Sequence, residues 1–191
     1  MRLAVFGETN RTKRYLVKRA LDAGYAVNVL ESPESEHRRG RKGLTSFVGE
    51  IDNTKSMDKV MKNADAAVCL LQGTQDDFDD KAEEIIRSLI SCMEANFVRR
   101  LVIFSYVKTQ TRQETPEHGG LLRSLLSTIV KPSGHSQTIV DLLKETDIDW
   151  TIVGHPPIAT SLASDIEQPV FDIETHSKNL AKQIINQITD V

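Results

Sequence analysis

The sequence has few of the residues that build disulfide frameworks or metal centres. Its 191 residues include two cysteines, Cys69 and Cys92, which are too few for a disulfide framework and typical of a reducing compartment. Three histidines, His37, His118 and His176, show no ligand spacing with cysteines or carboxylates. We therefore expect a cytoplasmic protein with no bound metal ion.

Long apolar runs are also missing. The longest, residues 66–71, is far shorter than the ~20 apolar residues that a membrane-spanning helix needs. The N-terminus lacks the long apolar core of a secretory signal. We expect neither membrane insertion nor export.

The chain has no excess of charge of one sign. Its 24 basic and 27 acidic residues give a formal net charge of −3, and aromatic residues make up 5% of the chain. Such a balance creates no overall field that would recruit nucleic acid or an anionic membrane. Two basic stretches, residues 11–19 and 38–42, contain almost no aromatic rings for stacking on bases. We expect no nucleic-acid partner and no membrane partner.

Short apolar segments alternate along the chain with segments of helical period. This alternation indicates βαβ units and a parallel sheet covered by helices on both faces. The expected strands are residues 3–6, 26–30, 45–48, 66–71, 101–105 and 150–153. The expected helices are one that ends at Gly24 and others at about residues 55–62, 77–96, 133–145 and 175–188. We predict a Rossmann-like, doubly wound α/β fold in three αβα layers, with residues 1–191 in one domain.

The first expected helix is amphipathic. Its apolar residues share one face, namely Leu16, Val17, Ala20 and Leu21. Its cations lie mostly on the other face, namely Lys13, Arg14, Lys18 and Arg19. Gly24 follows the last apolar residue, as the glycine after a helix end commonly does.

Two segments do not fit the alternation. Residues 32–43 form a polar loop, whereas residues 107–131 contain an apolar helical piece at 121–130. Ligands of such sheets bind beyond the carboxyl ends of the strands, where the strand order reverses. We expect residues 107–131 to lie over that crevice.

A glycine turn connects the first strand to the first helix, in the stretch V-F-G-E-T-N-R-T-K-R at residues 5–14. A dinucleotide fingerprint has three glycines, for the tight turn, for backbone approach to the pyrophosphate and for helix-to-strand packing. Gly7 stands at the first position, Asn10 at the second and Lys13 at the third. Asparagine tolerates a left-handed backbone. The lysine should push the helix away from the sheet unless its side chain turns to solvent.

Other residues of the turn could replace the phosphate contacts that the two missing glycines would allow. Thr9 and Thr12 supply hydroxyls, and Arg11, Lys13 and Arg14 bring positive charge to a helix N-terminus, which already favours anions. Two interpretations stay open. Either these side chains hold a pyrophosphate, or Gly7 is an ordinary turn glycine beside a solvated basic helix face. If the site is merely weakened, glycine at both Asn10 and Lys13 should tighten cofactor binding.

Ordered segments across nearly the whole chain carry a family resemblance. They read A-V-F-G-E-T-N-R-T, A-G-Y-A-V-N-V-L, F-V-G-E-I-D-N, N-A-D-A-A-V-C-L-L-Q-G-T, R-R-L-V-I-F-S and D-I-D-W-T-I-V-G-H-P-P-I. In this order they resemble the atypical short-chain dehydrogenases, specifically the small NAD(P)H-binding branch with flavin reductases, biliverdin reductase B-like proteins and NmrA-like proteins.

The resemblance implies a role for several residues. It implies that the pyrophosphate is held by Gly7, Thr9, Asn10, Arg11 and Thr12. It places Glu50 and Ile51 near adenine, and Leu71, Gly73 and Thr74 beside the nicotinamide ribose. It places Ser105 and Pro156 at the border of the nicotinamide and the substrate.

The chain also departs from the family pattern. Members that prefer NADP usually carry arginine just after the second strand, where this chain has Glu31. A carboxylate there binds a ribose 2′-hydroxyl and repels a 2′-phosphate, so we expect a slight preference for NAD. The cations that follow, Arg38, Arg39, Arg41 and Lys42, are expected to form a solvated basic loop, the alternative being that they fold back over a 2′-phosphate. His155 stands where the family often has arginine before the paired prolines.

The sequence contains no Tyr-x-x-x-Lys pair of the kind that protonates a carbonyl in the wider family. Tyr106 and Lys108 are two residues apart, and carbonyl reduction by the usual mechanism is not expected. Direct hydride transfer to FMN, FAD or a quinone needs no such acid. Ser105 is a candidate for orienting the ring, and His135 and His155 are candidate proton donors, the alternative being that both are surface histidines. We expect His135 to open a helix and His155 to lie in a loop.

We therefore predict an NAD(P)H-dependent oxidoreductase that reduces a small-molecule flavin or quinone. The alternative is a non-catalytic, NmrA-like protein that senses NAD(P) through a degenerate glycine turn. The substrate and the oligomeric state are not predicted.

Overall fold

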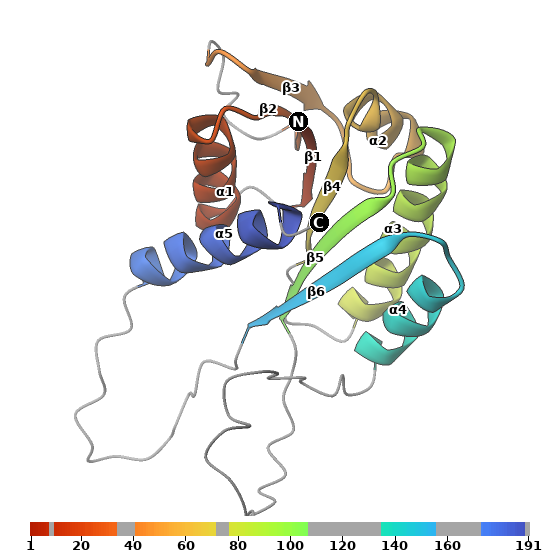
Figure 1. The fold of residues 1–191 in the computed structure, drawn as a ribbon. Coiled ribbons are helices and arrows are strands. Elements are labelled where there is room, and N and C mark those ends of the chain that lie inside the picture. Colours follow the sequence, from red (N-terminus) through yellow and green to blue (C-terminus); the bar gives the residue numbers. More distant parts are fainter. Residues whose placement is uncertain (8–9, 34–40, 72–76, 107–134, 156–172, 190–191) are drawn as a thin grey trace, which may run out of the picture.

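The computed structural model describes residues 1–7, 10–33, 41–71, 77–106, 135–155 and 173–189. Strands and helices alternate through these ranges, except that no helix is described between the second and third strands (Figure 1). The strands are β1 (Arg2–Gly7), β2 (Ala26–Glu31), β3 (Leu44–Val48), β4 (Ala66–Leu71), β5 (Arg100–Tyr106) and β6 (Asp149–His155). The helices are α1 (Arg11–Asp22), α2 (Thr54–Met61), α3 (Asp77–Ala95), α4 (His135–Lys144) and α5 (Ile173–Thr189).

The strands form one six-stranded sheet in the order β3-β2-β1-β4-β5-β6, with every neighbouring pair parallel. The order reverses between β1 and β4, so the crossovers before and after that reversal cover opposite faces. Helices α1 and α5 lie on one face and α2, α3 and α4 on the other (Figure 1). The predicted doubly wound, three-layer fold is confirmed. The helical piece expected at residues 121–130 lies outside the described residues.

Alternate residues of the central strands pack into two separate hydrophobic cores, one on each face of the sheet. On β1, Leu3 and Val5 pack under α1 and α5, while Ala4 and Phe6 pack under the other three helices. Strand β4 is buried along its whole length, as expected for a parallel strand covered on both faces. Among the helices that the structure describes, none has the length and apolar character that crossing a bilayer requires.

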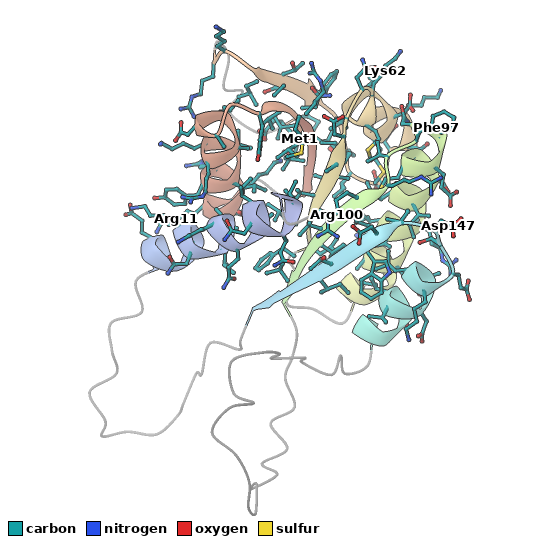
Figure 2. The ribbon with its side chains drawn as sticks, in the orientation of Figure 1. Met1, Arg11, Lys62, Phe97, Arg100 and Asp147 are labelled. Carbon is teal, nitrogen blue, oxygen red and sulfur yellow. The ribbon has the colours of Figure 1, made fainter. Side chains whose placement is uncertain are left out.

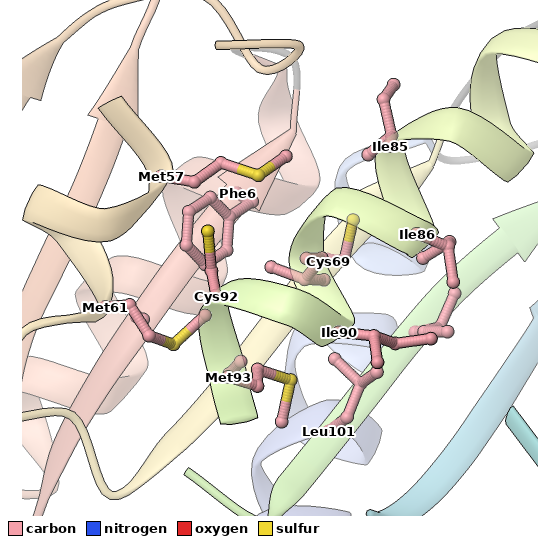
Figure 3. Packing of buried hydrophobic residues seen from close by; sticks show 14 of the residues in the cluster. Phe6, Met57, Met61, Cys69, Ile85, Ile86, Ile90, Cys92, Met93 and Leu101 are labelled. Carbon is pink, nitrogen blue, oxygen red and sulfur yellow. The ribbon is translucent and has the colours of Figure 1, made fainter. Parts of the chain in front are cut away.

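The core beneath α2 and α3 is rich in sulfur. Figure 3 shows Met57, Met61, Met93, Cys69 and Cys92 in the same cluster as Phe6, and all of these side chains are buried. Burial raises the pKa of Cys69 to about 12, although the nearby Lys13 opposes that shift. Burial, with a smaller contribution from Asp58, also raises the pKa of Cys92. Neither thiol has the character of a reactive nucleophile.

We expect Cys69 to react with a disulfide reagent such as DTNB at pH 8 only when the protein unfolds. Its thiol is fully buried and its pKa lies far above 8, so the native state presents almost no thiolate. The measurement follows the labelling rate of a Cys92→Ala variant over a range of urea concentrations. The rate should track the unfolded fraction, and fast labelling of folded protein would contradict the burial of this thiol.

Helices α1 and α3 end in the same hydrogen-bonded motif, with different residues at its left-handed position. After α1, the N–H groups of Gly24 and Tyr25 donate to the carbonyls of Leu21 and Ala20, each at 3.0 Å. After α3, the N–H of Phe97 donates to Glu94 at 3.2 Å and that of Val98 donates to Met93 at 2.9 Å. These are Schellman ends, which favour glycine. Gly24 has φ +82, as its predicted role requires, and Phe97 has φ +59.

We expect Phe97→Gly to stabilise the protein by about 1 kcal/mol. A left-handed backbone costs an L-residue about 1–2 kcal/mol, and the greater freedom of glycine in the unfolded chain removes part of that gain. The ring itself is 90% exposed, at the outer end of α3 (Figure 2). Urea unfolding measures the change. Phe97→Ala, which removes the ring but keeps a Cβ, should give little gain; an equal gain in both variants would assign the effect to the ring.

Candidate functional site

The candidate site lies at the carboxyl edge of the sheet, where the strand order reverses between β1 and β4. Gly7 ends β1 and pairs with Leu70 of β4. Leu71 ends β4 and pairs with Ser105 near the end of β5. The structure therefore brings the backbone of Gly7, Leu71 and Ser105 to one edge. Ligands of doubly wound sheets bind at this kind of position.

Gly7 cannot be replaced by a larger residue without disturbing the neighbouring strand. Its φ is +113, and a Cβ added there would lie 2.3 Å from the carbonyl oxygen of Leu70 and 2.8 Å from the Cβ of Leu70. Both values are far below van der Waals contact. The close approach of β1 and β4 thus requires glycine, and the chain leaves β1 in a direction that side-chain-bearing residues rarely adopt.

Asn10 caps α1 and does not use a left-handed backbone. Its φ of −134 and ψ of −178 are extended, a conformation open to any residue, so the tolerance of asparagine for a left-handed backbone is not used here. The side-chain Oδ1 accepts the backbone N–H of Lys13 at 2.8 Å. This is the usual N-cap bond. The N–H groups of Arg11 and Thr12 have no acceptor within the helix and mark its positive end.

Lys13 is buried between α1 and the sheet, so its side chain does not turn to solvent. Its side chain is 2% exposed. Its Nζ donates to the carbonyl of Gly7 at 2.8 Å and to the carbonyl of Leu30. The lysine therefore stands on the buried face of α1, not with the exposed cations. The third-glycine position is filled by a side chain that ties the ends of β1 and β2 to the helix.

Glu31 supplies the counter-charge to Lys13. It ends β2, and its Oε2 lies 3.6 Å from the Nζ of Lys13. Its side chain is 14% exposed, so the acid is the more accessible partner. Burial lowers the pKa of Lys13, and the nearby Glu31 carboxylate opposes that shift. The residue predicted to contact the adenosine ribose is therefore one half of an internal ion pair.

The remaining residues of the turn divide between two faces of α1. Thr12 is buried, while Arg11 and Arg14 are exposed. Arg11 and Arg14 line a hollow of about 330 Å³ on the outer side of α1, together with Tyr15, Lys18 and Glu174. Figure 2 shows Arg11 at the start of α1, on the outside of the molecule. Of the three expected cations, Lys13 alone is internal.

The residues expected near adenine follow β3. Glu50 is exposed, and Ile51 is half-buried against the core beneath α2 and α3. Leu71, expected beside the nicotinamide ribose, is buried at the end of β4. The other members of the predicted site, Thr9, Gly73, Thr74 and Pro156, lie outside the described residues, as do Arg38 and Arg39.

The structure describes the backbone positions of the candidate catalytic residues. Ser105 pairs with Leu71 and with Gly154 of β6, which places it at the same edge as Gly7. His135 is the first residue of α4, as expected. His155 is the last residue of β6 and pairs with Tyr106, so its expected place in a loop is wrong. Strand β6 continues past residue 153, its expected end, because β5 extends to Tyr106 and offers pairing partners to Gly154 and His155.

Sequence reasoning missed the ion pair between Lys13 and Glu31. The sequence does indicate that Lys13 faces the core. Lys13 precedes Leu16 by three residues and Ala20 by seven, which puts all three on one helical face. All three are buried in the structure. In the described ranges, no three His, Cys, Asp or Glu side chains gather in a way that could hold a metal ion.

Comparisons with known proteins agree with this fold. A family model described as NAD(P)H-binding matches residues 7–190. Similar solved structures include a Rossmann-fold NAD(P)-binding family protein from Shigella flexneri, with 15% identity, TM-score 0.56 and coverage of 80% of this chain and 66% of that one. The negative transcriptional regulator NmrA gives 18% identity, TM-score 0.57 and coverage of 80% and 44%.

A third similar structure was solved with a bound nucleotide. It is a short-chain dehydrogenase/reductase from Veillonella parvula in complex with NADP, with 12% identity, TM-score 0.55 and coverage of 79% of this chain and 67% of that one. The chain thus spans about two thirds of two of these proteins and less than half of NmrA. At these identities the structures show the shared fold.

Proposed function

The chain belongs to the NAD(P)H-binding family, and on that premise we propose that it is an oxidoreductase that passes hydride from a nicotinamide dinucleotide to a flavin or a quinone. The observation that carries the proposal is the turn at Gly7, held against Leu70 at the reversal of the strand order and followed directly by the positive end of α1.

The residues of the turn fit a dinucleotide. Gly7 has no side chain at the point where β1 and β4 approach each other, and a Cβ there would overlap Leu70. The cap at Asn10 uses the N–H of Lys13, so the N–H groups of Arg11 and Thr12, which have no acceptor within the helix, would donate to a diphosphate. The ammonium of Lys13 lies beneath the turn, paired with Glu31. In this assignment Gly7, Asn10, Arg11 and Thr12 hold the pyrophosphate.

We assign the adenosine end of the cofactor to the edge formed by β2 and β3. Glu31 would accept a hydrogen bond from the ribose diol, which favours NAD over NADP. Glu50 and Ile51, just after β3, would border adenine. Leu71 and Ser105 would border the nicotinamide at the ends of β4 and β5.

The nicotinamide, when bound, supplies the hydride, and an electron-poor flavin or quinone ring can accept it directly. The protein then contributes orientation and the exclusion of water. Ser105 is assigned to orienting a ring. His135 and His155 are assigned to supplying a proton after transfer, since imidazole titrates near neutral pH.

A second candidate function is a non-catalytic NAD(P) sensor. The fold likeness to the negative transcriptional regulator NmrA favours it, together with the replacement of the third fingerprint glycine by Lys13. Such a protein would bind the dinucleotide and leave it unreacted.

One experiment separates these functions. The purified protein is titrated with NADH and with NADPH while nicotinamide fluorescence is followed, and FMN or a soluble quinone is then added and oxidation is read at 340 nm. The oxidoreductase should bind at micromolar to millimolar cofactor and oxidise it when the acceptor is added. Binding without oxidation supports the sensor, and no binding of either cofactor at millimolar concentration rejects both. A strong preference for NADPH would overturn the assignment of Glu31.

A further inference from the structure

Lys13 and Glu31 form a charged unit beneath the turn that we assign to the cofactor. The Nζ of Lys13 lies 3.6 Å from the Oε2 of Glu31 and is held by the carbonyls of Gly7 and Leu30. Those carbonyls stand at or near the carboxyl ends of β1 and β2. A dinucleotide in this fold places its pyrophosphate beyond the first of these strands and its adenosine ribose beyond the second.

We propose that this ion pair acts as one selectivity device, in which Lys13 offsets the repulsion between Glu31 and a 2′-phosphate and so limits the preference for NADH over NADPH. The inference rests on the proposed function. It assigns Lys13 a positioning and electrostatic role toward the dinucleotide, in addition to its part in packing α1 on the sheet.

The two side chains of the ion pair are unequally exposed, so a ligand meets one charge before the other. Glu31 is 14% exposed and Lys13 is 2% exposed, so a ribose that approaches from solvent meets the carboxylate first and the ammonium behind it. The carboxylate accepts hydrogen bonds from a diol in the usual way. Its repulsion of a phosphate is reduced, however, because the ammonium contributes an opposite charge a few ångströms further away and neither charge is fully screened by water.

Removing either partner should shift selectivity in opposite directions. With Glu31→Gln, the ammonium of Lys13 loses this counter-ion beneath the turn and attracts a 2′-phosphate. With Lys13→Met, the carboxylate loses the counter-charge of Lys13 and repels that phosphate more strongly. With both changes the site beneath the turn carries neither charge, and the two dinucleotides should bind almost equally.

The test measures the dissociation constants of NADH and NADPH by calorimetry at pH 8 for the wild type, both single variants and the double variant. We expect Glu31→Gln to shift the ratio of the two constants at least tenfold toward NADPH. We expect Lys13→Met to shift it at least threefold toward NADH. The double variant should lie between the single variants.

Two controls separate this effect from general changes in charge or folding. Lys18 and Asp22 form an exposed ion pair at 2.7 Å on the outer face of the same helix, so Lys18→Met and Asp22→Asn make the same changes of charge away from the turn. Both should leave the ratio within twofold of wild type. Lys13→Gln, whose amide can still donate to a backbone carbonyl, replaces Lys13→Met if the methionine variant does not fold.

The outcomes also separate this inference from the proposed function. If the wild type binds dinucleotide and both Lys13 variants leave the ratio within twofold, Lys13 is structural and the inference is wrong. A shift toward NADPH in those variants overturns it as well. If the wild type binds neither dinucleotide, the proposed function fails, and the inference fails with it.

Discussion

Gly7→Ala is expected to lower the free energy of unfolding by about 3 kcal/mol or more and to abolish dinucleotide binding. The new Cβ would lie 2.3 Å from the carbonyl oxygen of Leu70, so β1 and β4 must move apart or the turn must rebuild. Overlap in a packed interior costs about 1–3 kcal/mol, and the positive φ of +113 adds further strain. Urea unfolding gives the stability, and titration with NADH gives the binding.

Gly24→Ala is the matched control for that substitution. Gly24 also has a positive φ, +82, but a Cβ there would meet nothing within 4 Å. The variant should therefore lose about 1 kcal/mol from backbone strain alone and should keep its affinity for NADH. If Gly7→Ala and Gly24→Ala lowered the free energy of unfolding equally, the overlap with Leu70 would have been removed at little energetic cost. The conformation of the turn would then not depend on that contact.

Lys13→Gly is expected to destabilise the protein by about 3–5 kcal/mol, although it restores the third glycine of a dinucleotide fingerprint. Breaking a buried ion pair by removing one partner costs about that amount. The carbonyls of Gly7 and Leu30 also lose their donor, and glycine is a poor helix residue. Chemical denaturation measures the loss, and Lys13→Met, which keeps most of the volume, should lose less.

This expectation reverses what the sequence alone favours. From the motif, glycine at both Asn10 and Lys13 should tighten cofactor binding if the site is merely weakened. The structure makes both side chains part of the turn, because Asn10 caps α1 and Lys13 joins the helix to two strand ends. The double variant should therefore bind NADH more weakly than wild type. Tighter binding with unchanged stability would show that neither contact supports the site.

The sheet could be predicted because each strand is short, apolar and bounded by turn residues. The six strand positions and the end of α1 at Gly24 follow from local patterns. The last residues of β6 could not be predicted in this way. His155 belongs to the strand because Tyr106 of β5 pairs with it, and that register is set by the neighbouring strand.

The site was harder to predict than the fold because its contacts join distant parts of the chain. The cap at Asn10 is local and has a sequence signal, since asparagine is among the best N-cap residues. Lys13 has a helical spacing that points inward, but its partners, Leu30 and Glu31, come from the next strand. A lysine is almost never fully buried unless it is paired, so its burial could be inferred only with those partners in place.

The central claim is that a dinucleotide binds at the turn between β1 and α1, and the chemical shifts of backbone amides test it most directly. In ¹⁵N-labelled protein, adding NADH should move the amide signals of Gly7, Arg11, Thr12 and Glu31. Those of Asn63 and Phe97, which precede β4 and β5 at the opposite edge of the sheet, should stay in place. Saturable shifts confined to that opposite edge, or no shifts at millimolar NADH, would contradict the account.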